Sequence, residues 1–286
     1  MAKETNISWC NCTFNPWIGC TKVSEECLNC YAKVLAAKPK INTPWGPGSP
    51  RRPASEESWG HPVKWNAEAV RSGVRKKVFC ASMADVFDDE APEGSRARLF
   101  ELIQATPQLD WLLLTKRPEL IEGQLKEIGV WDLLPLPNVW IGFSAGNQEN
   151  FDKRWPIVRE IPAVVRFCSY EPALGPITLP ADTTGELDWL ICGGETHTEK
   201  YNGRAMDPAW AQGIRNQCLR KKISFFFKQW GNWIPDGGKH DWYGKTSEVF
   251  SQRVEILDGV EWKQFPTPKL FRKVNGENAL TAQLTH

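Results

Sequence analysis

The chain has 286 residues, 41% of them hydrophobic, and 35 Lys and Arg against 34 Asp and Glu give a formal net charge of +1. This length allows one large domain, or a barrel with an addition, and a net charge near zero excludes a global attraction for polyanions. The sequence has neither an apolar run of about 18 residues nor a signal-peptide pattern, so we expect a cytoplasmic protein with no membrane partner.

The first element expected along the chain is a short strand around residues 6–9. Three cysteines follow it at Cys20, Cys27 and Cys30, in a C-x6-C-x2-C pattern. We expect Ser24 to cap a helix that carries Cys27 and Cys30 on one face, while Cys20 approaches from the preceding loop. The three thiols would then converge on one point. Residues 39–62 are rich in Pro and Gly and are expected to form an irregular flap.

Six apolar runs then recur at intervals typical of βα units, at residues 76–82, 110–115, 138–144, 163–169, 188–194 and 224–230. They are apolar almost throughout, as expected of parallel strands that are covered on both faces. Helical patterns follow Ser95, Pro118 and Asp207. With the opening strand, these runs predict an α/β fold in which six to seven parallel strands form a partial or full barrel.

Polar side chains follow the apolar runs. In barrels of this kind the loops after the carboxyl ends of the strands build the active site. The sequence therefore predicts one site formed by residues that are distant along the chain, namely Ser82, Asp85, Lys116, Arg117, Ser144, Glu171, Gly193, Gly194, Glu195, Lys228 and Gln229.

The pattern changes near residue 234. We expect residues 1–233 to form the barrel, and residues 234–286 to form a C-terminal appendage containing a β-hairpin that turns at Asp258 and Gly259. Residues 215–273 hold twelve Lys and Arg against six Asp and Glu, and the chain has 15 Trp. Basic surface with aromatic rings is used in base stacking, which favours a nucleic acid or nucleotide as partner.

The cysteine pattern leaves two kinds of metal site open. A reducing compartment keeps thiols reduced, and because the nine cysteines are an odd number, a disulfide framework cannot account for all of them. Four of them lie in apolar runs, where a buried thiol is expected. Structural zinc takes four ligands, which Cys10 or Cys12 would have to complete. Three cysteines alone fit a [4Fe-4S] cluster whose fourth iron is free for another ligand.

Several longer segments resemble a phage-associated family of uncharacterised, radical-SAM-like proteins with a three-Cys motif. They are "ISWCNCTFNPWIGCTKVSEECLNCYA", "KVFCASMADVF", "LLLTKRPE", "LPNVWIGFSAGNQ", "RFCSYEPALGPI", "LDWLICGGE" and "FFFKQWGNW". The resemblance implies that Cys20, Cys27 and Cys30 hold a [4Fe-4S] cluster. It also implies that Gly193, Gly194 and Glu195 correspond to the segment that binds the amino group of S-adenosylmethionine. Two features depart from the common motif: the first gap is six residues long, and the aromatic Tyr31 follows the last cysteine.

The resemblance further implies a radical enzyme with S-adenosylmethionine as cofactor and a one-electron reductant as partner. Reductive cleavage of S-adenosylmethionine would give a 5′-deoxyadenosyl radical that modifies or repairs a substrate. Cofactor contacts are expected from Tyr31, Ser82, Asp85, Ser144, Glu171 and the Gly193–Glu195 segment, and substrate chemistry from Lys116, Arg117, Lys228 and Gln229. The alternative is a non-catalytic zinc or iron–sulfur barrel that binds a protein partner or nucleic acid.

Overall fold

The chain folds around one sheet of seven parallel strands, in the order β1-β4-β5-β6-β7-β8-β9, in this computed structural model. The structure describes residues 5–196, 198–231, 233–236, 239–242, 255–269, 273–274 and 277–278. The strands are β1 (Cys12–Thr13), β4 (Lys76–Cys80), β5 (Leu109–Thr115), β6 (Val139–Ser144), β7 (Val165–Tyr170), β8 (Trp189–Gly193) and β9 (Ser224–Gln229).

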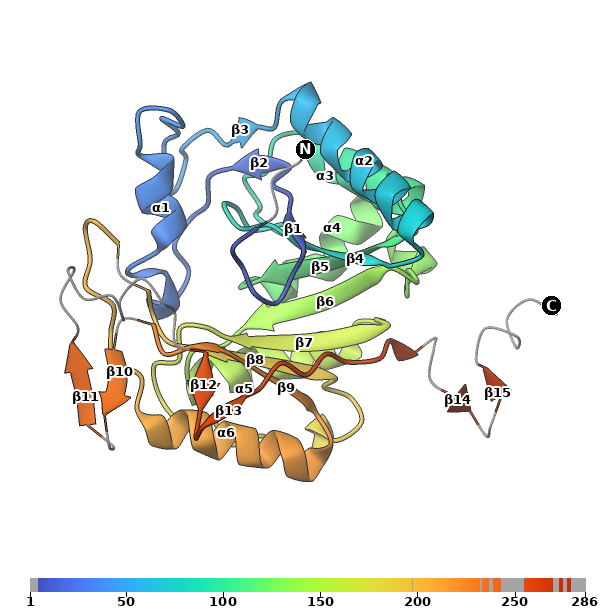
Figure 1. Cartoon of the computed structure of the whole chain (residues 1–286). Coiled ribbons are helices and arrows are strands. Elements are labelled where there is room, and N and C mark those ends of the chain that lie inside the picture. The colour runs from blue at the N-terminus through green and yellow to red at the C-terminus, as the bar shows by residue number, and fades with distance from the viewer. Residues whose placement is uncertain are drawn as a thin grey trace.

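The seven strands of this sheet follow one another in the order in which they occur along the chain. The two edge strands, β1 and β9, do not pair with each other, so the sheet is a curled half-barrel (Figure 1). The predicted α/β partial barrel is confirmed. The seventh strand is β1 at Cys12–Thr13, however, and the expectation of a strand at residues 6–9 was wrong. Cys12 pairs with Val78 of β4, and β1 is an edge strand of the sheet.

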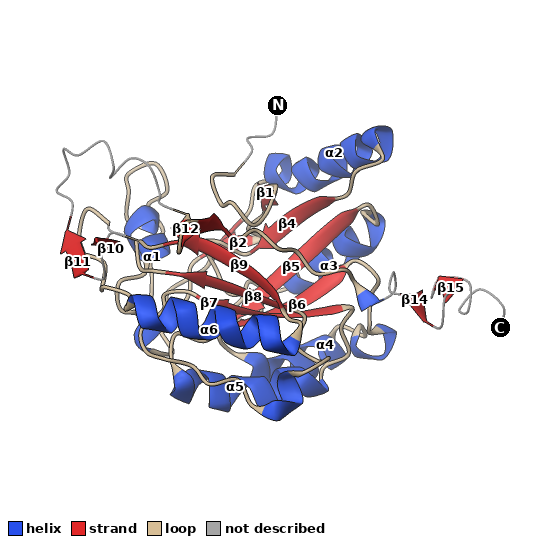
Figure 2. Ribbon diagram, turned by 60° about the horizontal axis from the view of Figure 1, so that its bottom comes forward, coloured by secondary structure: helices blue, strands red, loops and turns tan. Residues whose placement is uncertain are grey.

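Helices cover the convex face of the sheet, as Figure 2 shows for α4, α5 and α6. The longer helices are α2 (Glu56–Ser72), α3 (Ser95–Ala105), α4 (Ile121–Glu127), α5 (Gln148–Glu160) and α6 (Pro208–Lys221). Asp207 caps α6 by accepting a hydrogen bond from the backbone N–H of Ala209 at 2.8 Å. The 3₁₀ turns are η1 (Glu25–Cys27), η2 (Pro118–Leu120), η3 (Trp131–Leu133) and η4 (Ala181–Thr183).

The expected flap at residues 39–62 is only partly irregular. Short strands β2 (Trp17–Ile18) and β3 (Arg52–Pro53) pair antiparallel, and α2 begins at Glu56 behind its N-cap Ser55. Pro62 lies inside α2, in its second turn, where the missing N–H removes one hydrogen bond without ending the helix. The helix forms because Trp59, Pro62, Trp65 and Ala69 give it a buried face.

Alternate side chains of the strands pack on opposite faces of the sheet. One hydrophobic cluster joins the helices to residues such as Trp111, Ile141 and Leu190 on the convex face. A second cluster fills the concave face with Phe79, Leu112, Trp140, Phe167, Trp189 and Phe226, and Trp9 from the N-terminal segment packs on it. This aromatic layer therefore forms a second hydrophobic core on the concave face.

The C-terminal region includes the predicted hairpin. Strands β12 (Ile256–Leu257) and β13 (Val260–Glu261) pair antiparallel, and Asp258 and Gly259 form the turn with positive φ angles. The residues after it lie along β9: the N–H of Phe227 donates to the carbonyl of Trp262 at 2.8 Å. The remaining short strands are β10 (Trp233–Asp236), β11 (Lys239–Trp242), β14 (Lys273–Val274) and β15 (Glu277–Asn278). The division at residue 233 stays a prediction.

Candidate functional site

A cavity of about 170 Å³ opens at the carboxyl ends of the strands on the concave face. The cysteine loop, which we define as residues 20–31, and the strand ends together form its wall. Eleven of the residues predicted for the site line this one cavity: Cys20, Cys27, Cys30, Tyr31, Ser82, Asp85, Lys116, Arg117, Ser144, Glu171 and Lys228.

The two-residue period of the strands explains much of this set. In β7, Phe167 lies in the aromatic layer of the concave face, so Ser169 and Glu171 face the same way farther along the chain. By the same period Leu114 and Lys116 follow Leu112, and Lys228 follows Phe226. The cavity therefore has an apolar floor and a polar rim.

The cysteine loop is not the single helix expected from its sequence. It forms the 3₁₀ turn η1, and a separate helix α1 (Tyr31–Ala36) begins after Cys30, whose ψ of 117° breaks the helical path. Cys27 and Cys30 thus do not share a helix face, although both line the cavity. The hydroxyl of Tyr31 donates to the carbonyl of Ser82 at 2.9 Å and ties the start of α1 to the end of β4.

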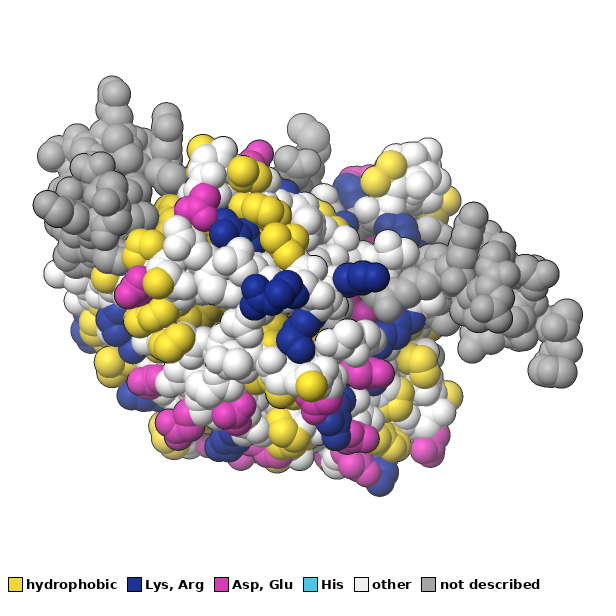
Figure 3. All heavy atoms as spheres, turned by 90° about the horizontal axis from the view of Figure 1, so that it is seen from below, with side chains coloured by type: hydrophobic (Ala, Val, Ile, Leu, Met, Phe, Trp, Pro, Cys, Tyr) yellow, Lys and Arg dark blue, Asp and Glu magenta, His cyan; other side chains and the backbone are white. Residues whose placement is uncertain are grey.

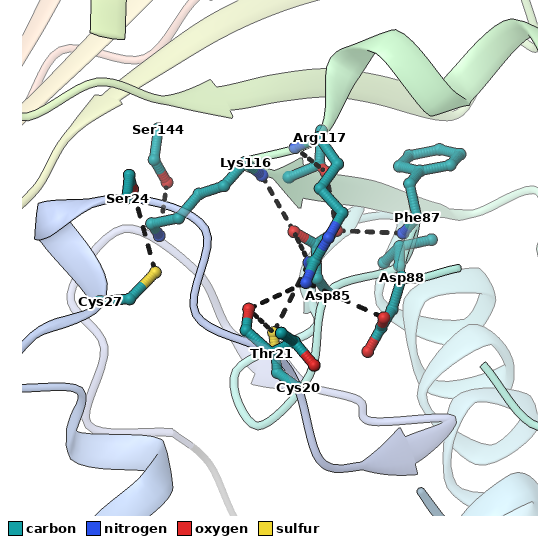
Figure 4. Close-up of polar contacts among 12 residues, drawn as sticks. Cys20, Thr21, Ser24, Cys27, Asp85, Phe87, Asp88, Lys116, Arg117 and Ser144 are labelled. Atoms are coloured by element: carbon teal, nitrogen blue, oxygen red, sulfur yellow. Dashed lines mark hydrogen bonds and ion pairs between the residues drawn. The ribbon is translucent and has the colours of Figure 1, made fainter. Parts of the chain in front are cut away.

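Cys20 is held next to a buried network of charges (Figure 4). Nη1 of Arg117 lies 3.7 Å from Cys20 Sγ and 3.2 Å from an oxygen of Asp85, while Nη2 donates to the carbonyl of Thr21 at 2.8 Å. Asp85 also accepts hydrogen bonds from Thr115 Oγ1 and from the N–H of Lys116. Both oxygens of Asp85 are thus used by protein donors, and Arg117 fixes the cysteine loop.

Lys116 reaches from the end of β5 toward Ser144 and the second cysteine (Figure 4). Its ammonium donates to Ser144 Oγ at 3.0 Å. Burial alone would lower the pKa of Lys116, but its electrostatic interactions with Cys27 and Glu26 outweigh burial and raise this pKa. Burial raises the pKa of Cys20 to about 12 and also raises the pKa of Cys30. Lys116 therefore places a positive charge beside the thiols of the cysteine loop.

Glu26 anchors the cysteine loop to β6 and α5. Its carboxylate accepts hydrogen bonds from the N–H of Gly146 at 2.7 Å and from Arg154 Nη1 at 2.9 Å. The side chains of Arg154 and Glu26 are 3% and 0% exposed, so the ion pair is buried. Arg154 also donates to the carbonyl of Ser144, which joins this anchor to the end of β6.

A second anchor uses the predicted Glu195. Its carboxylate accepts from Asn29 Nδ2 at 2.9 Å and from Arg204 at the backbone N (2.8 Å), at Nε (2.9 Å) and at Nη2 (2.6 Å). Asn29 lies between Cys27 and Cys30, so Glu195 holds the middle of the cysteine loop. Glu195 does not line the cavity, and its oxygens are engaged by protein donors rather than directed at a ligand.

Three more predicted residues lie behind the cavity wall. A Cβ on Gly194 would lie 1.9 Å from the carbonyl oxygen of Trp230, and one on Gly193 would lie 2.6 Å from Oε1 of Glu171. Close packing against the backbone therefore requires Gly194, whereas Gly193 is close only to the end of the Glu171 side chain. Gln229 is buried and donates to Thr196 Oγ1 at 2.7 Å.

Sequence reasoning missed several residues of the site. Trp9 and Ser169 line the cavity, and Glu26, Arg154 and Arg204 hold the cysteine loop. The two-residue period of β7 was a signal for Ser169. The three anchor residues had no local signal, because each one acts on a segment that is distant in sequence.

The three thiols of the cysteine loop line one cavity, but the expected convergence on one point is not met. Among the described residues, no three His, Cys, Asp or Glu side chains are grouped as ligands of one metal ion. Cys12 is buried in the convex-face core, and neither it nor Cys10 lines the cavity, so neither is placed to complete a zinc site with the three thiols.

Fold and site together define an α/β half-barrel protein with a thiol-lined cavity at the carboxyl ends of its strands. Residues 4–266 match the model of a family described as "Protein of unknown function (DUF5131)", and the chain belongs to this family. No curated protein matches the chain. Membership in an uncharacterised family agrees with the resemblance described above, and phage association stays a prediction.

One solved structure is similar in fold over much of the chain. It is a mutant of spore photoproduct lyase "with bound AdoMet and dinucleoside spore photoproduct", at 14% sequence identity and a TM-score of 0.43. The match covers 86% of this chain and 61% of the lyase chain. This likeness is too distant to assign an activity or the role of any residue.

Within the described residues, none of the helices has both the length and the apolar character needed to cross a membrane.

Proposed function

We propose that this protein is a radical-type enzyme that binds a [4Fe-4S] cluster and S-adenosylmethionine. The observation that carries the proposal is the placement of Cys20, Cys27 and Cys30 on the wall of one cavity at the carboxyl ends of parallel strands. No other cysteine is among the residues that line this cavity, which favours a cluster with one iron left free of protein ligands.

Cys20, Cys27 and Cys30 would hold such a cluster, and the chemistry it would supply is one-electron reductive cleavage of S-adenosylmethionine to methionine and a 5′-deoxyadenosyl radical, with the electron coming from an external reductant. The chain's own residues prepare the site. Lys116 and Arg117 place two cations beside the thiols, where they offset the negative charge of the ligands. Glu26 and Glu195 hold the cysteine loop in place from two sides.

A nucleic-acid base or nucleotide is the substrate that the charge distribution favours. Helix α6 ends with Arg220 and Lys221, and Lys222 follows as its C-cap just before β9 begins, so these cations lie at the amino end of the sheet and would contact a long polyanion outside the cavity. Figure 3 shows Lys and Arg side chains gathered near the centre of the face that is seen from below. Basic surface of this kind attracts the phosphates of a polyanion without reading its sequence.

The test is anaerobic reconstitution of the full chain with iron and sulfide, followed by iron and zinc analysis and EPR of the reduced protein. We expect about four irons per chain and a [4Fe-4S] signal that changes when S-adenosylmethionine is added. Cys27→Ala should abolish the signal. Cys10→Ala should leave it unchanged, because Cys10 does not line the cavity.

Two outcomes would contradict the proposal. Stoichiometric zinc without a cluster would show that the cysteines form a structural metal site. A cluster whose EPR signal does not change when S-adenosylmethionine is added would show an iron–sulfur protein that does not bind the proposed cofactor.

A further inference from the structure

Two oppositely charged side chains meet on the concave wall beyond the cysteine loop. Glu171 follows β7, Lys228 lies in β9, and Oε1 and Nζ are 2.8 Å apart. Strand β8 runs between β7 and β9, so the pair has to reach across it. Gly193 of β8 makes this reach possible, because a Cβ there would lie 2.6 Å from Oε1 of Glu171.

The surroundings of this ion pair are those of a binding site. Both side chains line the cavity, and they are only 12% and 20% exposed. Ser169 Oγ donates to Oε2 of Glu171 at 3.4 Å, and the cavity also has apolar lining from Ile7, Trp9, Phe79 and Leu114. Trp9 itself is buried and gives this part of the cavity an aromatic floor.

The charges of Glu171 and Lys228 offset each other, which decides what this end of the cavity binds best. An ionic ligand would have to separate the pair and leave one partner buried without its counter-charge, which is unfavourable. A neutral ligand with an N–H beside an acceptor atom avoids this cost. Its N–H donates to the Glu171 carboxylate, which only accepts, and its acceptor receives from the Lys228 ammonium, which only donates.

We propose that this end of the cavity binds the edge of a nucleobase, with Glu171 and Lys228 reading a ring N–H and the carbonyl next to it. The apolar floor suits a flat ring. This inference names the substrate class of the proposed function and rests on it for the reaction, but the binding itself needs neither cluster nor S-adenosylmethionine.

The test measures binding of uridine and guanosine to the full chain by ligand-observed NMR, without iron or reductant. Each nucleoside is paired with the form whose ring N–H is methylated, 3-methyluridine and 1-methylguanosine. We expect at least one parent nucleoside to bind, and its methylated form to bind at least about tenfold more weakly, because the methyl group leaves Glu171 without its donor.

Matched double variants separate recognition from stability. Glu171→Gln with Lys228→Gln removes both charges at similar size and should abolish the preference for the parent nucleoside over its methylated form. The control is Glu122→Gln with Lys126→Gln, which removes an exposed ion pair on α4 and should leave binding unchanged. Circular dichroism on both proteins checks that they are folded.

Three outcomes would overturn the inference: neither nucleoside binds, parent and methylated forms bind equally, or the Glu171/Lys228 variant keeps the preference. A cluster signal that responds to S-adenosylmethionine together with any of these would leave the proposed function standing and reject only the substrate class.

Discussion

At the scale of single residues, Glu26 is the side chain on which the cysteine loop depends most. It lies directly before Cys27, is 5% exposed, and pairs with Arg154, which is 2% exposed. Removing one partner of a buried pair leaves the other charge without compensation, at a cost of about 3–5 kcal/mol. The Nε of Arg154 has no partner among the described residues, and beyond Glu26 its guanidinium donates only to the carbonyl of Ser144 among the hydrogen bonds described above.

We therefore expect Glu26→Gln to lower the free energy of unfolding by about 3 kcal/mol or more. Urea unfolding followed by tryptophan fluorescence measures it. Glu25→Gln is the matched control: Glu25 is exposed, and its change should stay within about 0.5 kcal/mol. Equal effects of the two variants would mean that the buried pair does not hold the loop.

Glu195 gives the second anchor a dependence on pH. Burial would raise the pKa of Glu195, but the hydrogen bonds from Arg204 and Asn29 outweigh burial and hold this pKa below its usual value. A carboxyl group with a lowered folded-state pKa stabilises the fold above its unfolded pKa of about 4.3, and this contribution is lost as the pH falls through the folded-state value.

The stability difference between the native protein and Glu195→Gln should accordingly be largest near neutral pH and shrink below about pH 4. Urea midpoints at a series of pH values measure it. A difference that stays constant with pH would show that the charge of Glu195 contributes nothing to the anchor.

The residues that carry the site differ in how far the sequence could reveal them. Lys116, Ser144, Glu171 and Lys228 were predictable because each lies at the carboxyl end of an apolar run, and the fold brings those ends together. Glu195 was found at its strand end, but its contacts were not predictable. The partner of Glu26 lies 128 positions away, and Asn29 lies 166 positions from Glu195.

At the scale of elements, the parallel strands follow from their sequences and the cysteine loop does not. Each run near β4 to β9 is apolar on both faces, which only a strand covered on both sides satisfies. Residues 24–36 have a helical sequence, yet the structure divides them into η1 and α1. Tertiary anchors at Glu26 and Asn29 outweigh the helix propensity of this segment.

The close packing between strands β6 and β7 leads to a prediction about stability. Gly142 lies opposite Phe167, and a Cβ on Gly142 would come within 2.1–2.4 Å of the phenyl ring. We expect Gly142→Ala to destabilise the protein by about 1–3 kcal/mol through overpacking. Thermal unfolding measures the change.

The control for that variant is Gly213→Ala in α6, where a Cβ meets nothing within 4 Å. Alanine inside a helix should stabilise the protein by about 0.5–1 kcal/mol. Opposite signs for the two glycine variants are the expected result, and a neutral Gly142→Ala would mean that the ring can move away.

At the scale of the whole molecule, the C-terminal region completes the half-barrel at its β9 edge. The backbone of Gln264 donates to the carbonyl of Phe225, and the indole of Trp189 donates to the carbonyl of Gln264 at 2.9 Å. Leu257 is fully buried in the convex-face core. Residues 255–269 thus cover an edge that would otherwise be free to pair with another chain.

A chain shortened to residues 1–233 should therefore be less soluble than one that ends at residue 269, and its β9 amides should exchange faster. Sedimentation and hydrogen exchange at Phe225 and Phe227 measure the two effects. A soluble 1–233 fragment with a protected β9 would support residue 233 as a true domain boundary.

The position of Trp9 makes the depth of the cavity independent of the cysteine loop. Its ring lies 4.6 Å from that of Phe79 and 6.2 Å from that of Trp189, so one side chain from outside the sheet spans the concave face from β4 to β8. The thiols and their cations belong to other segments. Substitution of this single residue would therefore alter the depth of the cavity while the thiols and the cations beside them stay in place.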